Sequence, residues 1–585
     1  MRNFNVRKGL AFMVVGMTVL VSSAYSKSIA GQQSEPKGYP IATEVITTLE
    51  RTIVPTPKPA QKVFLNELSK YDRYGYGKWS FGGPLMVDKR LDIMGSTYNG
   101  PSVARKEKLL RFFTISDIHI TDKETPNQFI YLQRLHEGSP IGGALYSGTM
   151  LSTTQVLDAA VQTVNALHKK DPIDFGLSLG DAANSTQYNE LRWYIDVLDG
   201  RVINPSSGAH LGAKTVDYQK PFKAAGLDKA IPWYQTIGNH DHFWIGSIPV
   251  NDTLRKTFIG ENVIAMGDVL KDPRNISKPD YYMGVVDGSK PYGDVKFAGP
   301  VSDFKAPPQV VADPDRRSLL RTEWLKEFFT TTSNPVGHGF NAVDADKGFA
   351  CYSFVPKASV PIKVIVLDDT QKEDDGSADI HGHGFLDQAR WDWLKKELAD
   401  GDTAGQLMII AAHIPIGVED PKSEMGWWLD PQNAVTLPDL LAELHSHPNL
   451  LVWLAGHRHL NTVKAFVSPD AARPELGFWE VETSSLKDFL QQFRTFDIYR
   501  NSDNTISIVT VNVDPAVKAG TPAAKSRKYA VATQQMVSAD IARYNPTNDP
   551  TIKPMPTGSY NAELVKQLSP EMQAKLENFG VSASK

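Results

Sequence analysis

The sequence predicts an α/β fold from three observations. From Leu109 onward, apolar runs of strand length alternate with amphipathic stretches of helix length. The strand-like runs of this region end in polar residues. Beyond about residue 460, strand-like runs follow one another without helices between them. Alternation of the first kind favours sheets covered by helices, and we interpret the later strands as a second, more antiparallel sheet.

The spacing of apolar residues along the chain predicts the individual strands and helices. The first strands are expected at residues 110–115, 175–179, 231–237, 362–367, 407–412 and 450–454. Helices are expected between them at residues 153–168, 187–198, 318–329, 386–398 and 437–444. The later strands are expected at residues 462–467, 478–482, 493–499 and 505–513. One weak amphipathic stretch follows at residues 562–579.

The first 26 residues have the pattern of a secretory signal peptide. Basic residues precede the apolar run from Gly9 to Val21, and small residues at Ala24 and Ser26 fit a cleavage site. The alternative is an uncleaved membrane anchor, for which the run is shorter than the ~20 residues that a spanning helix needs. We therefore expect an exported protein, periplasmic or secreted, without stable membrane association after cleavage.

The rest of the chain divides into three parts by composition. Residues 27–105 are rich in Pro, Gly and Tyr without a sustained period, which predicts an N-terminal wrapping extension. Residues 106–514 form the main predicted domain, and two long stretches at about 201–229 and 243–314 are expected as insertions on its rim. Residues 515–585 are a polar, Pro-interrupted C-terminal extension.

Charge and cysteine content limit the classes of function. The 585 residues include 62 Lys and Arg against 66 Asp and Glu, so the chain has no basic field that could track a long nucleic acid. The lone Cys351 excludes an intramolecular disulfide. We expect a small molecule as the binding partner, and the oligomeric state is left open.

Oxygen and imidazole donors follow the predicted strands. The first strand ends before Asp117 and His119, and the second before Gly180-Asp181. Further donors follow the other strands: Asn239, His240, Asp241, His413, His457 and His459. Because ligands gather beyond the carboxyl ends of strands in α/β sheets, these side chains are expected to meet at one site.

The number and type of these donors predict two metal ions. These donors exceed the four to six positions of one ion, and two ions about 3.5–4 Å apart account for them. Two such cations repel each other, so an anion must lie between them, and we expect Asp181 to bridge. Imidazole, carboxylate and amide donors suit Mn, Fe, Zn or Ni and disfavour Ca or a thiolate site.

The ordered blocks resemble the calcineurin-like metallophosphoesterases. These blocks are Asp117-x-His119, Gly180-Asp181, Gly238-Asn239-His240-Asp241, His413 and Gly456-His457-x-His459. The resemblance implies a four-layer α/β/β/α sandwich of two mixed sheets with flanking helices. It also implies that Asp117, His119, Asp181 and His459 hold one metal, and that Asp181, Asn239, His413 and His457 hold the other. His240 resembles the catalytic histidine of the family.

The expected activity is hydrolysis of phosphoric esters by a hydroxide that bridges two metal ions. Phosphomonoesterase and phosphodiesterase activities both fit. His240 could stabilise the phosphoryl oxygens or protonate the leaving group. Asp241 could hold the tautomer of His240, or it could instead support the metal ligands from behind or serve as a turn residue. The alternative from another class is a noncatalytic exported binding or surface protein on the same scaffold. Asn184 stands where purple acid phosphatases place a tyrosine, which disfavours a purple iron centre.

Several nearby residues have two open interpretations. His242, His381, His383 and the pair Trp427-Trp428 either line the pocket or belong to ordinary loop and rim packing. For Arg458, strand alternation favours a structural salt bridge. For the pair Asp368-Asp369, we expect loop anchoring instead of metal binding.

Overall fold

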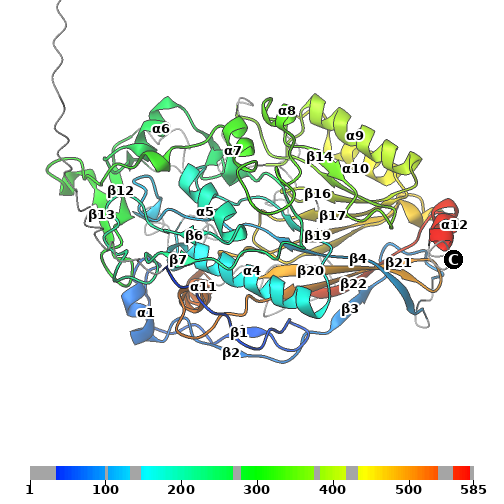
Figure 1. Cartoon of the computed structure of the whole chain (residues 1–585), viewed down its shortest axis with the longest axis horizontal. Helices are drawn as coiled ribbons and strands as arrows, with labels where there is room; N and C mark the ends of the chain where they lie inside the picture. Colours follow the sequence, from blue (N-terminus) through cyan, green and yellow to red (C-terminus); the bar gives the residue numbers. More distant parts are fainter. Residues whose placement is uncertain are drawn as a thin grey trace, which may run out of the picture. The chain divides into compact units, whose positions relative to one another are not determined.

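Two mixed β-sheets form the centre of the computed structural model (Figure 1). The structure describes residues 35–98, 100, 103–131, 146–267, 278–373, 383–416, 433–537 and 558–579. From Pro36 onward these residues form one compact unit. The predicted signal peptide lies outside the described residues.

The first sheet has seven strands and surrounds the first predicted strand. Their order is β3 (Val87–Arg90), β22 (Asn561–Lys566), β21 (Ile506–Val513), β20 (Phe493–Asn501), β4 (Arg105–Ile115), β5 (Phe175–Ser178) and β8 (Trp233–Gln235). Strands β4, β5 and β8 are parallel, whereas β20 runs antiparallel to both β4 and β21. The carboxyl ends of three parallel strands therefore lie at one edge of this sheet.

The second sheet has six strands with a parallel centre. Their order is β14 (Tyr352–Phe354), β15 (Ile362–Val366), β16 (Leu407–Ala411), β17 (Leu450–Ala455), β19 (Phe478–Glu482) and β18 (Val463–Phe466). The four strands β15, β16, β17 and β19 are parallel, and β14 and β18 pair antiparallel at the two edges. Near-continuous apolar runs are typical of such strands because both faces are buried.

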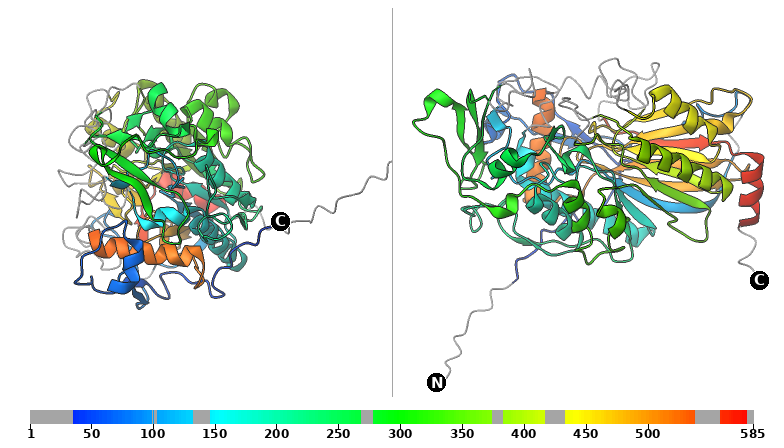
Figure 2. Two further views of the ribbon diagram at one scale, coloured as in Figure 1. Left: turned by 90° about the vertical axis from the view of Figure 1, so that its left-hand side faces the viewer. Right: turned by 90° about the horizontal axis from the view of Figure 1, so that it is seen from above.

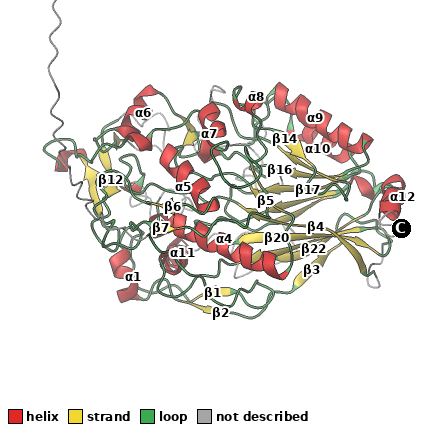
Figure 3. Ribbon diagram, in the orientation of Figure 1, coloured by secondary structure: helices red, strands yellow, loops and turns green. Residues whose placement is uncertain are grey.

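The two sheets pack face to face, with helices outside (Figures 1 and 3). Alternate residues of β16 separate the layers: Ile409 joins the core shared with the seven-stranded sheet, whereas Ile410 packs with helices α9 (Gln388–Thr403) and α10 (Leu437–Ser446). Helices α4 (Thr153–Lys170) and α5 (Tyr188–Leu198) contribute apolar side chains to the core of the seven-stranded sheet. The predicted α/β/β/α class of two mixed sheets is confirmed.

The predicted grouping of the strands was wrong. The late strands do not form a sheet of their own: β18 and β19 join β17 in the six-stranded sheet, whereas β20 and β21 join β4. Hydrophobic period identifies a strand but not its neighbour, because pairing depends on contacts far away in the sequence. The stretch at residues 562–579 is likewise not one helix but strand β22 followed by α12 (Pro570–Phe579). Figure 2 shows α12 (red) beside the ends of the strands.

The extensions and insertions carry short elements. The N-terminal extension contains β1 (Ile53–Pro55), α1 (Leu68–Tyr74), β2 (Trp79–Phe81) and β3, and the C-terminal one contains α11 (Pro522–Val537), β22 and α12. The first insertion contains β6 (Val202–Ile203) and β7 (Phe222–Lys223). The second contains β9 (Phe243–Trp244), β10 (Ile248–Pro249), α6 (Asp252–Ile259), β11 (Ala265–Met266), β12 (Tyr281–Val286) and β13 (Val295–Pro300). Before β14 lie α7 (Arg321–Glu327) and α8 (Ala342–Ala345).

Within the described residues, every helix is too short or too polar to span a lipid bilayer.

Candidate metal centre

The predicted donors lie on loops that leave the parallel strands of both sheets. Asp117 and His119 follow β4, Asp181 follows β5, and Asn239 begins a single 3-10 turn after β8. The six-stranded sheet contributes the other three, with His413 after β16 and with His457 and His459 after β17. The loops are tied together, because the His119 N–H donates to the Asp181 carbonyl at 2.9 Å. All seven predicted donors come together at this edge.

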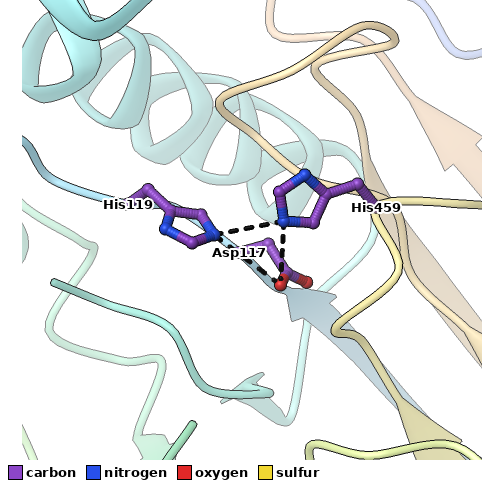
Figure 4. A group of neighbouring side chains, drawn as sticks. All are labelled: Asp117, His119 and His459. Atoms are coloured by element: carbon purple, nitrogen blue, oxygen red, sulfur yellow. Dashed lines mark hydrogen bonds and ion pairs between the residues drawn. The ribbon is translucent and has the colours of Figure 1, made fainter. Parts of the chain in front are cut away.

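One half of the centre consists of Asp117, His119 and His459 (Figure 4). The Nε2 atom of His459 lies 3.3 Å from Asp117 Oδ1 and 3.1 Å from His119 Nε2. The distance from His119 Nε2 to Asp117 Oδ1 is 3.9 Å. Three potential ligand atoms thus face one small volume, as the coordination of one ion requires.

The other half consists of Asn239, His413 and His457. The Oδ1 atom of Asn239 lies 2.9 Å from His413 Nε2 and 3.2 Å from His457 Nδ1. Asp181 lies between the halves, because its Oδ2 atom is 3.4 Å from His413 Nε2 and 3.5 Å from His119 Nε2. This is the position that the predicted bridging role needs.

Five of the predicted ligands have strained backbone. Asp117, His119, Asp181, His457 and His459 all have φ between 46° and 75°. Residues other than glycine rarely adopt these backbone angles. Each such residue lowers the stability of the fold by an amount on the order of 1–3 kcal/mol. Such strain persists at functional sites, where the surrounding structure holds side chains in a fixed direction.

The glycines beside these residues allow the loops to approach closely. A Cβ atom on Gly456 would lie 1.8 Å from Ser116 Oγ and 2.6 Å from Asp117 Oδ2. A Cβ atom on Gly238 would lie 2.2 Å from the backbone nitrogen of Asp181. The glycines in the sequence blocks are therefore required by packing against the donors.

Burial and charge fit a cation at this position. Asp117, His119, Asp181, Asn239 and His413 are buried, and charged groups in such surroundings need counter-charges. Burial lowers the pKa of His119, whereas Asp117 and Asp488 outweigh the effect of burial and raise that of His459 to about 9. Two imidazole nitrogens 3.1 Å apart repel unless a proton or a cation lies between them. The donor set therefore fits divalent transition-metal ions.

His240 lies next to this centre, but the predicted pairing with Asp241 was wrong. The Nδ1 atom of His240 lies 2.8 Å from the carbonyl oxygen of Asn184. The Asp241 carboxylate instead accepts three backbone N–H groups, from Asp181 and Ala183 at 3.0 Å and from Gly238 at 2.8 Å. Asp241 therefore fixes the loop that carries Asp181, and the Asn184 carbonyl sets the tautomer of His240.

The residues with open interpretations have different outcomes. His242 lies in a buried polar network, with its ring nitrogens 2.9 Å from Thr370 Oγ1 and 3.1 Å from Glu373 Oε1, and it is separate from the ligand groups. His383 is buried. His381, Trp427 and Trp428 lie outside the described residues.

Two predicted structural roles are confirmed. Arg458 forms the expected salt bridge, with its Nε donating to Glu482 Oε2 at 2.9 Å. Asp369 anchors the loop after β16, because its carboxylate accepts the N–H groups of His413 and Ile414 at 3.1–3.2 Å.

Sequence reasoning missed two groups beside the donors. One is the Asn184 carbonyl, which as a backbone atom leaves no signal in residue types. The other is Asp488, whose Oδ2 atom lies 2.7 Å from His459 Nδ1. Asp488 lies six residues beyond the end of β19, so a search limited to strand ends does not find it.

The residues of the centre differ in exposure. His240, His457 and His459 are partly exposed, whereas the other five donors and ligands named above are buried. The assignment of the seven residues as metal ligands stays a prediction, and their geometry agrees with it.

Comparison with known proteins gives distant structural likenesses. No protein-family model matches the sequence, and no curated protein matches it. A dimetal phosphatase from Danio rerio is similar over 70% of this chain and 97% of its own, with 13% identity and a TM-score of 0.33. The sulfate thiohydrolase SoxB from Thermus thermophilus is similar over 77% of this chain and 63% of its own, with 11% identity and a TM-score of 0.28. Likenesses this distant assign no activity to the chain.

Proposed function

We propose that the protein is a metal-dependent hydrolase of phosphoric esters of the calcineurin-like metallophosphoesterase type. The observation that supports this most is the position of Asp181 Oδ2, within 3.5 Å of an imidazole nitrogen from each half of the centre. A carboxylate oxygen between two sets of nitrogen and oxygen donors suits a pair of cations better than a single ion.

Each half of the centre would hold one ion. Asp117, His119, Asp181 and His459 would bind one, and Asp181, Asn239, His413 and His457 would bind the other. Two bound divalent ions would supply Lewis acidity and a water nucleophile that is active at neutral pH. Mn, Fe, Zn and Ni all suit these donors.

The residues of the chain fix the geometry of this site. The Asn239 amide donates to the Gly246 carbonyl at 2.9 Å, which leaves Asn239 Oδ1 directed at His413 and His457. The Asp181 Oδ1 atom accepts a hydrogen bond from the backbone N–H of His240 at 2.8 Å, which leaves Oδ2 between the two halves of the centre. Ligand atoms that are held before binding lower the cost of ordering the site.

His240 would act on the substrate at its Nε2 atom. Because Nδ1 is held by the Asn184 carbonyl, Nε2 is the ring atom left for a substrate oxygen. When the ring is protonated, Nε2 can donate a hydrogen bond to a phosphoryl oxygen or give its proton to the leaving oxygen. Monoesters and diesters both fit this role. We propose that the substrate is a small phosphoester in the periplasm or outside the cell.

A hydrolysis screen tests the proposal. The protein without residues 1–26 is stripped of metal and reloaded separately with Mn, Fe or Zn, and then assayed with p-nitrophenyl phosphate and bis-p-nitrophenyl phosphate. We expect metal-dependent release of p-nitrophenol from at least one of them. Asp181→Ala should abolish it and reduce the metal content below two ions per chain. A folded protein that binds two ions but hydrolyses no phosphoester would favour the noncatalytic binding protein.

A further inference from the structure

The outer nitrogen of His459 contacts a carboxylate that the proposed function does not use. Asp488 lies in the loop between β19 and β20, and its Oδ2 atom is 2.7 Å from His459 Nδ1. On the opposite side of the ring, His459 Nε2 is 3.3 Å from Asp117 Oδ1. The imidazole of His459 is therefore held between two carboxylates, one inside the centre and one behind it.

This contact determines which nitrogen of His459 can bind a cation. A carboxylate accepts hydrogen bonds, so the proton of the neutral ring resides on Nδ1 and the lone pair on Nε2 faces the centre. His413 has the same arrangement with a backbone carbonyl, because its Nδ1 is 2.7 Å from the Leu179 oxygen. In contrast, His119 Nδ1 is buried and has no hydrogen-bond partner among the described residues. Orientation by an outer partner is thus not common to every predicted ligand.

The loop that carries Asp488 is bonded to the loop that carries Asp117. The Ser485 hydroxyl donates to the Asp117 carbonyl at 2.7 Å and accepts the backbone N–H of Asp488 at 3.1 Å. The Leu486 N–H donates to the Ser116 carbonyl at 3.2 Å. A displacement of Asp488 relative to Asp117 would break these hydrogen bonds, so the two carboxylates are fixed relative to the ring between them.

The second oxygen of the Asp488 carboxylate, Oδ1, is buried without a hydrogen-bond partner among the described residues. The carboxylate therefore directs its hydrogen bonding at His459.

We propose that Asp488 is a positioning residue that fixes the tautomer and orientation of His459 for metal binding. This inference rests on the proposed function, because it concerns one of the two proposed ion sites. Outer partners of metal-binding histidines are typically worth 10–100-fold in metal affinity or activity. The effect is expected at the ion site of Asp117, His119 and His459, and not at that of Asn239, His413 and His457.

The test measures Zn²⁺ and Mn²⁺ affinity by chelator competition for the wild type, Asp488→Asn and Asp488→Ala. The alanine variant loses the acceptor, so one of two ions should bind about 10–100-fold more weakly. The asparagine variant keeps an uncharged oxygen acceptor of the same size and should fall between the wild type and alanine. This graded order is not expected from a role in packing alone. The thermal midpoint of the metal-free variants should stay within a few degrees of the wild type.

Asp402→Asn is the matched control. Asp402 Oδ2 lies 2.6 Å from His447 Nδ1, which reproduces the same histidine–carboxylate contact in residues outside the metal centre. This variant should keep wild-type affinity for both ions.

The outcomes separate this inference from the proposed function. A wild type that binds no ions overturns the proposed function and, with it, the role of Asp488. A wild type with two ions and an Asp488→Ala variant of equal affinity overturns only the role of Asp488. If the alanine variant does not fold, wild-type affinity of Asp488→Asn for both ions overturns it in the same way.

Discussion

Replacing Gly238 by alanine tests whether close loop packing holds the bridging carboxylate. The new Cβ would lie 2.2 Å from the Asp181 nitrogen and 2.3 Å from Asp181 Oδ1, whereas ordinary contact begins at 3.4 Å. The Gly238 N–H donates to Asp241 Oδ2 at 2.8 Å, so Gly238 cannot move away without losing a buried hydrogen bond. Asp181 must therefore shift by about 1 Å, as judged from ordinary packing distances.

A shift of this size has two expected consequences. Overpacking at a buried site costs about 1–3 kcal/mol of unfolding free energy. Misplacement of a catalytic group by about 1 Å costs roughly 100-fold in rate, which corresponds to about 2.7 kcal/mol of activation free energy. We therefore expect kcat/KM for the better p-nitrophenyl substrate to fall at least about 100-fold in Gly238→Ala.

The assay compares Gly238→Ala with Gly83→Ala under identical metal loading. Apart from Gly83 and its two chain neighbours, no atom of the described residues lies within 4 Å of a Cβ built on Gly83, so the control carries the same chemical change without a clash. Its kcat/KM and metal content should match the wild type. A folded Gly238→Ala protein with two bound ions and wild-type kcat/KM would refute the packing argument.

Three further changes test other parts of the site and fold. His240→Asn should keep both ions and lose at least about 100-fold in kcat, the usual contribution of a proton-transfer or hydrogen-bonding group, and wild-type turnover would contradict the role of His240. Asp241→Ala leaves three buried N–H groups without their acceptor, each worth about 1–3 kcal/mol, so the denaturation midpoint and metal content should both fall; an unchanged midpoint would contradict its anchoring role. Burial lowers the pKa of His338 to about 4, below the ~6.5 of an unfolded histidine, so the unfolded state binds the extra proton and stability falls as pH drops from about 6.5 to 4. His338→Asn should lose this part of the pH dependence, about 2 kcal/mol between pH 7 and pH 5 in denaturant titrations, and an equal change of stability in both proteins would contradict it.

Local sequence patterns predicted the elements that position the site. The run at residues 478–482 coincides with β19, and the run at residues 407–412 differs from β16 by one residue. These strands are buried on both faces, and their continuous apolar runs end where polar loop residues begin. The donors follow directly, so a search at strand ends finds them.

Features that depend on long-range contacts were not predictable in this way. The pairing of β20 with β4 joins segments nearly 400 residues apart, and no local pattern specifies it. The partner of His240 is a backbone carbonyl, and an adjacent Asp241 was a more visible but wrong candidate. Asp488 reaches His459 through a loop whose path depends on Ser485 and Asp117, and residue type alone does not show that path.

Anomalous diffraction from crystals of the Mn²⁺-loaded protein tests the central claim most directly. We predict two peaks about 3.5–4 Å apart, with Asp181 between them and His459 and His413 on opposite sides. A single peak, or ions bound away from Asp181, would contradict a two-ion centre and the hydrolase function that depends on it.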